Sequence, residues 1–151
     1  MNQLQHQISE LESHISNLEK TNPSVSNSTI GWQIDHCLMV INGVIPQIEV
    51  SNPTEFHAKF NFNRLIVFTT GKIPKGKIRA PKSVTPIDVA SSEELKSKIE
   101  LAKTNILKLK SLPKNSFFKH PFFKDLNVKQ TERFLRIHTH HHLKIIQDIL
   151  K

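Results

Sequence analysis

Cysteine, glycine and long apolar runs are scarce in this 151-residue sequence, and each scarcity excludes a class of protein. The single cysteine, Cys37, cannot form an internal disulfide, so we expect a reducing, cytoplasmic location. Four glycines and eight prolines are too few for a collagen-like or low-complexity chain. No apolar run approaches the roughly 20 residues of a membrane-spanning helix, and the first residues do not resemble a secretory signal. We therefore expect one soluble globular domain over residues 1–151.

Acidic residues are absent between Glu55 and Asp88, although the whole chain carries 13 of them against 21 lysines and arginines. The net charge of +8 suggests nucleic acid, an anionic surface or an acidic ligand as a partner. Because no nucleic-acid-binding motif accompanies the charge, a solvated basic loop is the alternative. The residues of this window that could attract an anion include Lys72, Lys75, Lys77 and Arg79.

Apolar residues recur at helical spacing through most of the chain and predict an all-α fold. Long helices are expected at about residues 2–20, 29–44 and 91–112, and from residues 127–129 to the C-terminus. A shorter helix is expected after Pro53, with Phe56, Phe60, Leu65 and Phe68 on its buried side. Residues 71–86 are predicted to form a long basic connection, and residues 117–123 an aromatic loop. This pattern indicates a four-helix bundle with a long crossover connection and one short extra helix.

Four of the nine histidines lie close together near the C-terminus, at positions 138 and 140–142. The apolar helical pattern continues after them, so they belong to the fold and are not a purification tag. At about 100° per residue, His138 and His142 fall on the core-facing side of the helix. The same geometry places His140 on the solvent side and His141 at the boundary between the two.

Two imidazoles one helical turn apart can share a metal ion, which makes His138 and His142 candidate ligands. The alternative is a pair of core histidines satisfied by other polar groups. A third ligand is needed, and His36 is the best candidate. The helix surface around it carries Trp32 and Val40 rather than charged side chains. The alternative is a structural role for His36. His141 is a possible accessory residue. Cys37 points about 100° away from His36 and is expected to pack as a small apolar residue.

The remaining histidines show no such spacing. His6, His14 and His57 are interpreted as surface residues, and His120, which precedes Pro121, is expected to have a turn or packing role. The HExxH motif of zinc proteases is absent, as are a glycine-rich phosphate loop and a serine nucleophile elbow. No catalytic residue and no general base can be named from the sequence.

Three segments together resemble the DinB-like superfamily, in one of its branches of unassigned function. They are Trp32-Gln33-Ile34-Asp35-His36-Cys37-Leu38, His120-Pro121-Phe122-Phe123, and His138-x-x-His141-His142-Leu143. The resemblance covers most of the chain and implies a four-helix bundle that holds a divalent metal, commonly zinc or nickel. Carried over by position, the ligands would be His36, His138 and His142. Two features depart from the family: Lys124 replaces a usual glycine, and a tryptophan early in the last helix is missing.

The resemblance implies an enzyme that depends on the metal, either a transferase that uses a low-molecular-weight thiol or a hydrolase. It also makes a homodimer possible, since such bundles often form dimers. We expect water in the open coordination positions, as in three-ligand catalytic sites. Two alternatives are a non-catalytic basic helical module that binds nucleic acid or an acidic partner, and a family member whose metal is only structural. Steep salt dependence of nucleic-acid affinity would indicate the first of these alternatives.

Overall fold

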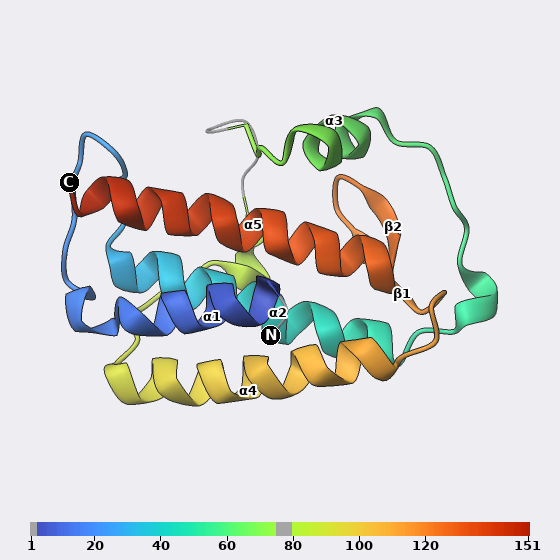
Figure 1. Cartoon of the computed structure of the whole chain (residues 1–151), viewed down its shortest axis with the longest axis horizontal. Coiled ribbons are helices and arrows are strands. Elements are labelled where there is room, and N and C mark those ends of the chain that lie inside the picture. The colour runs from blue at the N-terminus through green and yellow to red at the C-terminus, as the bar shows by residue number, and fades with distance from the viewer. Residues whose placement is uncertain (1–2, 75–79) are drawn as a thin grey trace.

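The computed structural model describes residues 3–74 and 80–151 and is mostly helical, in agreement with the predicted fold class (Figure 1). The helices are α1 (Gln3–Ser13), α2 (Ile30–Glu49), α3 (Phe62–Thr70), α4 (Ser92–Ser111) and α5 (Val128–Ile149). Three short 3-10 helices are η1 (Ile15–Asn17), η2 (Pro53–Glu55) and η3 (Lys82–Val84), and two strands are β1 (Phe117–His120) and β2 (Lys124–Asn127). None of these helices is long and apolar enough to cross a bilayer.

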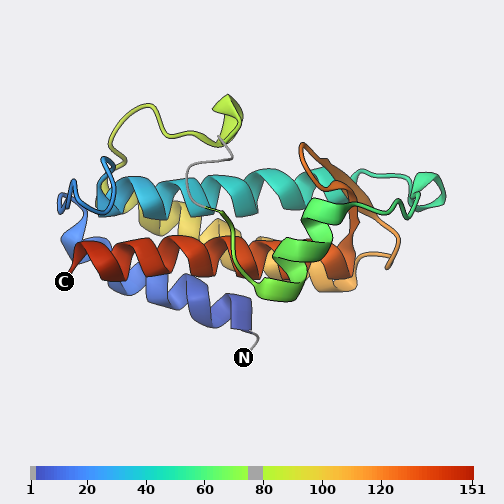
Figure 2. The same ribbon diagram turned by 90° about the horizontal axis from the view of Figure 1, so that it is seen from above.

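Four long helices surround one apolar core. Helices α1 and α2 each pack against both α4 and α5, so α1 lies diagonally opposite α2 (Figures 1 and 2). Helices α2 and α4 run in the same direction, which requires the long crossover that the sequence predicts. Fully buried side chains at helical spacing on α2 and α4 belong to this core: Ile34, Leu38, Ile41, Ile45, Ile48, Leu95 and Ile99.

Two helix ends differ from the predictions. Helix α1 ends at Ser13 instead of near residue 20, because the chain turns there and the Leu18 carbonyl accepts a hydrogen bond from the Gly31 amide at the start of α2. Helix α2 continues past Val44 through Pro46 to Glu49. Proline removes only one backbone donor, and Ile48, fully buried beyond it, supplies apolar contacts that favour the extra turn.

The extra helix, α3, starts later than predicted and is not buried in the way predicted. Phe56 and Phe60 precede the helix. Phe60 and Leu65 are 73% and 51% exposed, and Val67 is the buried residue of α3. Polar contacts attach α3 to the rest of the molecule. The Asn61 side chain donates to the Phe122 carbonyl (2.9 Å), and Arg64 donates to the carbonyls of Phe123 and Asp125 (3.2 and 3.3 Å).

The predicted aromatic loop is an antiparallel β-hairpin, in which Phe117 pairs with Asn127 and His120 with Lys124. The prediction was wrong because a two-stranded ribbon has no stable apolar core of its own and depends on the elements that cover it. Here β1 packs on α2 and both strands on α5. Ser51, just after α2, accepts a hydrogen bond from the Phe117 amide through its hydroxyl (2.9 Å).

Lys124, where the resemblance leads us to expect glycine, has a backbone φ of 61°. This left-handed conformation brings the Cβ of an L-residue close to the backbone, at a cost of about 1 kcal/mol or more that glycine avoids. We expect Lys124→Gly to raise the free energy of unfolding by up to about 1 kcal/mol, measured by urea denaturation. Lys119→Gly on the same hairpin is the control and should lower it; a loss of stability in Lys124→Gly would contradict the strain argument.

Candidate metal centre

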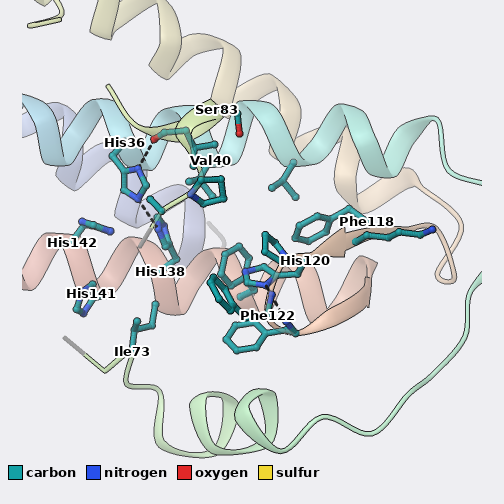
Figure 3. Close-up of a pocket in the computed structure, with 18 of the residues that line it drawn as sticks. His36, Val40, Ile73, Ser83, Phe118, His120, Phe122, His138, His141 and His142 are labelled. Atoms are coloured by element: carbon teal, nitrogen blue, oxygen red, sulfur yellow. Dashed lines mark hydrogen bonds between the residues drawn. The ribbon is translucent and has the colours of Figure 1, made fainter. Parts of the chain in front are cut away.

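His36 on α2 and His138 and His142 on α5 come together in the structure, as the sequence analysis predicts. One ring nitrogen from each lies within 4.8 Å of the other two, and the ring centroids are 4.6 to 5.0 Å apart. Figure 3 shows the three rings turned toward one another across the α2–α5 interface. Three imidazoles in this arrangement could hold a metal ion.

The faces of α5 follow the predicted helical geometry. His142 is buried, His138 is partly buried beside it, and His140 is exposed. His141 is half-buried at the boundary, with its ring edge against His142 at a centroid distance of 5.2 Å. His141 thus lies next to the cluster without belonging to the group of three.

A backbone carbonyl of the crossover connection orients the His36 ring. Its Nδ1 lies 2.6 Å from the Val84 carbonyl oxygen, and since a carbonyl can only accept, Nδ1 carries the proton. The ring also stacks on Trp32 at a centroid distance of 5.1 Å. The Nε2 atom of His36 therefore keeps a free lone pair that faces the cluster.

The side chain of Gln33 orients the His142 ring in the same way. The His142 Nδ1 lies 2.6 Å from Oε1 of Gln33 and donates to it, while the Gln33 amide group donates to the Ser26 hydroxyl (3.3 Å). His142 Nε2 is then also unprotonated. A ligating histidine typically gives its second ring N–H to a carbonyl or carboxylate in this way, which fixes its tautomer and orientation.

His138 leaves the hydrogen bonding of the cluster incomplete. Its Nε2 lies 3.2 Å from Nε2 of His36, and its Nδ1 is buried with no hydrogen-bond partner in the described part of the chain. A single proton on His138 can bridge to one neighbouring lone pair, but not to those of His36 and His142 together. Two nitrogens bound to one zinc ion at about 2.1 Å are about 3.0 to 3.4 Å apart, so the 3.2 Å between His36 and His138 suits a shared metal.

Burial keeps all three imidazoles neutral at pH 7. Desolvation is the largest cause of the lowered pKa of His36, and it lowers the pKa values of His138 and His142 well below 6.5. Mutual repulsion between the rings lowers the pKa values of His138 and His142 further. Since only neutral imidazole ligates a metal, the donors are ready for an ion at neutral pH.

The cluster forms part of the wall of a cavity of about 410 Å³. Most of the wall is aromatic or aliphatic, and its polar members besides the three histidines and His141 are Gln47, Ser83, Lys119 and His120. No acidic side chain is among the described residues that line it. The open side of the cluster thus faces a space of the size that small-molecule sites have.

Of the four basic residues proposed to attract an anion, the structure describes only Lys72. Lys75, Lys77 and Arg79 lie outside the described residues, and Lys72 is exposed near Ile73, which lines the cavity. Arg64, in the same basic window, instead donates to three backbone carbonyls, among them that of Lys59. An anion-binding role for the window stays a prediction.

The other predicted residues agree with the structure, except that His14 is less exposed than expected. Cys37 is fully buried and its pKa is strongly raised by desolvation, so it is an inert packing residue. His6 and His57 are exposed, and His14 is half-buried. His120 has the turn and packing role predicted for it, because its Nδ1 accepts from the amides of Phe122 and Phe123.

Sequence reasoning missed the groups that orient the ligands. Gln33 is one helical turn before His36, and its spacing could have marked it as a residue of the same face. No signal in the sequence points to the Val84 carbonyl, because any residue type can supply a backbone oxygen.

Family models, curated proteins and solved structures contain no match to this chain. The likeness to the DinB-like superfamily therefore stays a prediction from the short motifs, and the geometry of the three histidines carries the functional argument.

The Gln33 contact leads to a prediction for metal affinity. Gln33→Leu should weaken zinc binding by about 10- to 100-fold, because His142 loses the acceptor that fixes its tautomer and ring orientation. The measurement is a zinc titration against a competing chelator. Gln47→Leu, on the same helix and at the cavity wall, is the matched control and should leave the affinity unchanged. Equal affinities of Gln33→Leu and wild type would show that the contact does not orient a ligand.

Proposed function

We propose that this protein binds one divalent metal ion, zinc or nickel, through His36, His138 and His142, in a DinB-like four-helix bundle. We propose further that it is an enzyme, a metal-dependent transferase that uses a low-molecular-weight thiol or a hydrolase that uses water. The observation that carries the proposal is the convergence of three ring nitrogens, two of them held with free lone pairs, at the wall of a cavity.

The arrangement favours a catalytic over a structural metal. Among the described residues, the donor set contains three histidines and no fourth protein ligand. Structural zinc sites usually have four protein ligands, whereas catalytic sites keep a position for water or substrate. Because the three histidines line the cavity, that position would face it.

A divalent ion held by three neutral ligands would act as a Lewis acid and lower the pKa of a bound thiol or water, which supplies a nucleophile at neutral pH. The chain's own residues orient and shield this site. Val84 and Gln33 hold the His36 and His142 rings, and Trp32 stacks on His36. The rest of the cavity wall near the cluster is mostly aromatic or aliphatic.

Metal content is the direct test. We expect protein purified without an affinity tag or a metal column to contain about one zinc or nickel ion per chain by elemental analysis. The double variant His138→Ala, His142→Ala should contain none, while His140→Ala, with its exposed side chain, should match the wild type. Wild-type protein without stoichiometric metal, even after supplementation, would refute the proposal.

The enzymatic part needs its own measurement. The metal-loaded protein is expected to consume a thiol such as cysteine or glutathione in the presence of an electrophile, or to hydrolyse an activated ester, and the double variant should do neither. Full metal occupancy without either activity would favour a structural metal.

A further inference from the structure

His120 is one of the residues that line the cavity, and it carries a hydrogen-bond donor that no described group accepts from. Its Nδ1 accepts from the amides of Phe122 and Phe123, both at 3.1 Å, so Nδ1 carries no proton in the folded turn. Burial lowers the pKa of His120 to about 4, and the ring is neutral at pH 7. A neutral imidazole with a bare Nδ1 has its proton on Nε2. No described residue accepts a hydrogen bond from that N–H.

The ring is held firmly in one orientation. It stacks on Phe123 at a centroid distance of 4.4 Å, and its plane lies at 76° to that of Phe134 at a centroid distance of 4.6 Å. The turn that carries it is attached to α3, because Asn61 donates to the Phe122 carbonyl and Arg64 to that of Phe123. A donor that is already oriented loses little entropy when it binds a ligand.

His120 and the metal-binding cluster line the same cavity (Figure 3). Phe134 lies between them, with its ring 4.6 Å from that of His120 and 5.6 Å from that of His138. The remaining wall is apolar apart from a few neutral groups and Lys119, and none of its described side chains is acidic. A ligand that fits this wall has an apolar body, carries no positive charge and presents a hydrogen-bond acceptor to His120.

We propose that the cavity binds a neutral carbonyl compound with an aromatic or aliphatic body, and that the carbonyl oxygen accepts a hydrogen bond from Nε2–H of His120. This inference rests on the proposed function in that it assigns a substrate class, the esters, thioesters and amides, to the same cavity. Fixed donors beside a carbonyl oxygen also stabilise the negative charge that develops there during nucleophilic attack. His120 is thus a substrate-contacting residue as well as part of the turn.

A pair of probes that differ only in the acceptor tests the contact. Acetophenone and ethylbenzene have nearly the same shape, and their dissociation constants are measured by NMR titration on the protein as purified. We define the acetophenone preference as the dissociation constant of ethylbenzene divided by that of acetophenone. This ratio should be about fivefold larger for the wild type than for a His120 variant, because one neutral hydrogen bond contributes about that factor. The 15N resonance of His120 Nε2 should shift with acetophenone and much less with ethylbenzene.

Two variants separate ligand contact from folding. In His120→Asn the side-chain oxygen can still accept from the turn amides, whereas His120→Phe keeps an aromatic ring without an acceptor. Both should lose the acetophenone preference, and His120→Asn should retain the wild-type thermal midpoint more closely. Lys119→Ala removes the charged side chain among the described wall residues; it is the control and should retain the preference.

Three results would overturn the inference: an unchanged preference in a folded His120 variant, a proton on Nδ1 of His120 in the 15N spectrum, or no binding of either probe in the cavity. The metal content of each sample is determined separately by elemental analysis. Absence of metal would refute the proposed function. The hydrogen bond from His120 to acetophenone could still be tested, because His120 alone makes it.

Discussion

Replacing His142 with alanine is expected to weaken zinc binding by more than about 100-fold. Loss of an outer-shell partner of a ligand already costs about 10- to 100-fold, and removal of the ligand itself leaves only His36 and His138. The same change removes the hydrogen bond that His142 Nδ1 donates to Oε1 of Gln33 at 2.6 Å. The measurement is a competition titration with a zinc chelator of known affinity, at a pH above 7 where all three histidines are neutral.

His140→Ala is the matched control for this prediction. His140 is on the same helix, two residues away, and is exposed, so its removal should leave zinc affinity within about twofold of the wild type. Circular dichroism of each variant checks that α5 persists. A folded His142→Ala protein with wild-type affinity would show that the ion, if bound, is held elsewhere.

Metal-free protein is expected to lose most of its stability between about pH 6.5 and pH 4. Burial lowers the pKa of His120 to about 4 and also lowers the pKa values of His36, His138 and His142. In the unfolded chain these groups titrate near 6.5, so below that pH the unfolded state binds more protons and is favoured. His120 alone accounts for roughly 3 kcal/mol once the pH is below 4, a substantial part of a typical total of about 5–15 kcal/mol.

Urea denaturation of chelator-treated protein at several pH values from 7.5 to 4 measures this effect. Each buried neutral histidine contributes a slope of up to about 1.4 kcal/mol per pH unit, and His120→Asn should therefore have a shallower profile than the wild type. Glu94, whose pKa is lowered by hydrogen bonds from Ser91, contributes only at the acidic end of the range. A free energy of unfolding that stays constant from pH 7 to 4.5 would mean that the histidines are not buried as the structure places them.

Local sequence features were sufficient to predict where α2, α4 and α5 begin and which histidines of α5 face inward. Ser91 and Glu94 form the capping box at the start of α4, and Asn127 caps α5, where the sequence places their N-termini. The 3.6-residue period alone separates His138 and His142 from His140, because side-chain direction along a helix depends only on position. Neighbouring residues determine these features, so they can be predicted without the rest of the molecule.

Contacts between distant segments determined what the sequence did not reveal. The exposed apolar side of α3 depends on the hydrogen bonds of Asn61 and Arg64 to the Phe117–Asn127 hairpin. The hairpin in turn depends on its hydrogen bond to Ser51. Each of these three residues is more than 55 residues away in the chain from its partner. The tautomer of His36 depends on the Val84 carbonyl, which carries no sequence signal. Periodicity specifies which side chains face inward, but a cluster of three ring nitrogens forms only when α2, α5 and the crossover connection pack together.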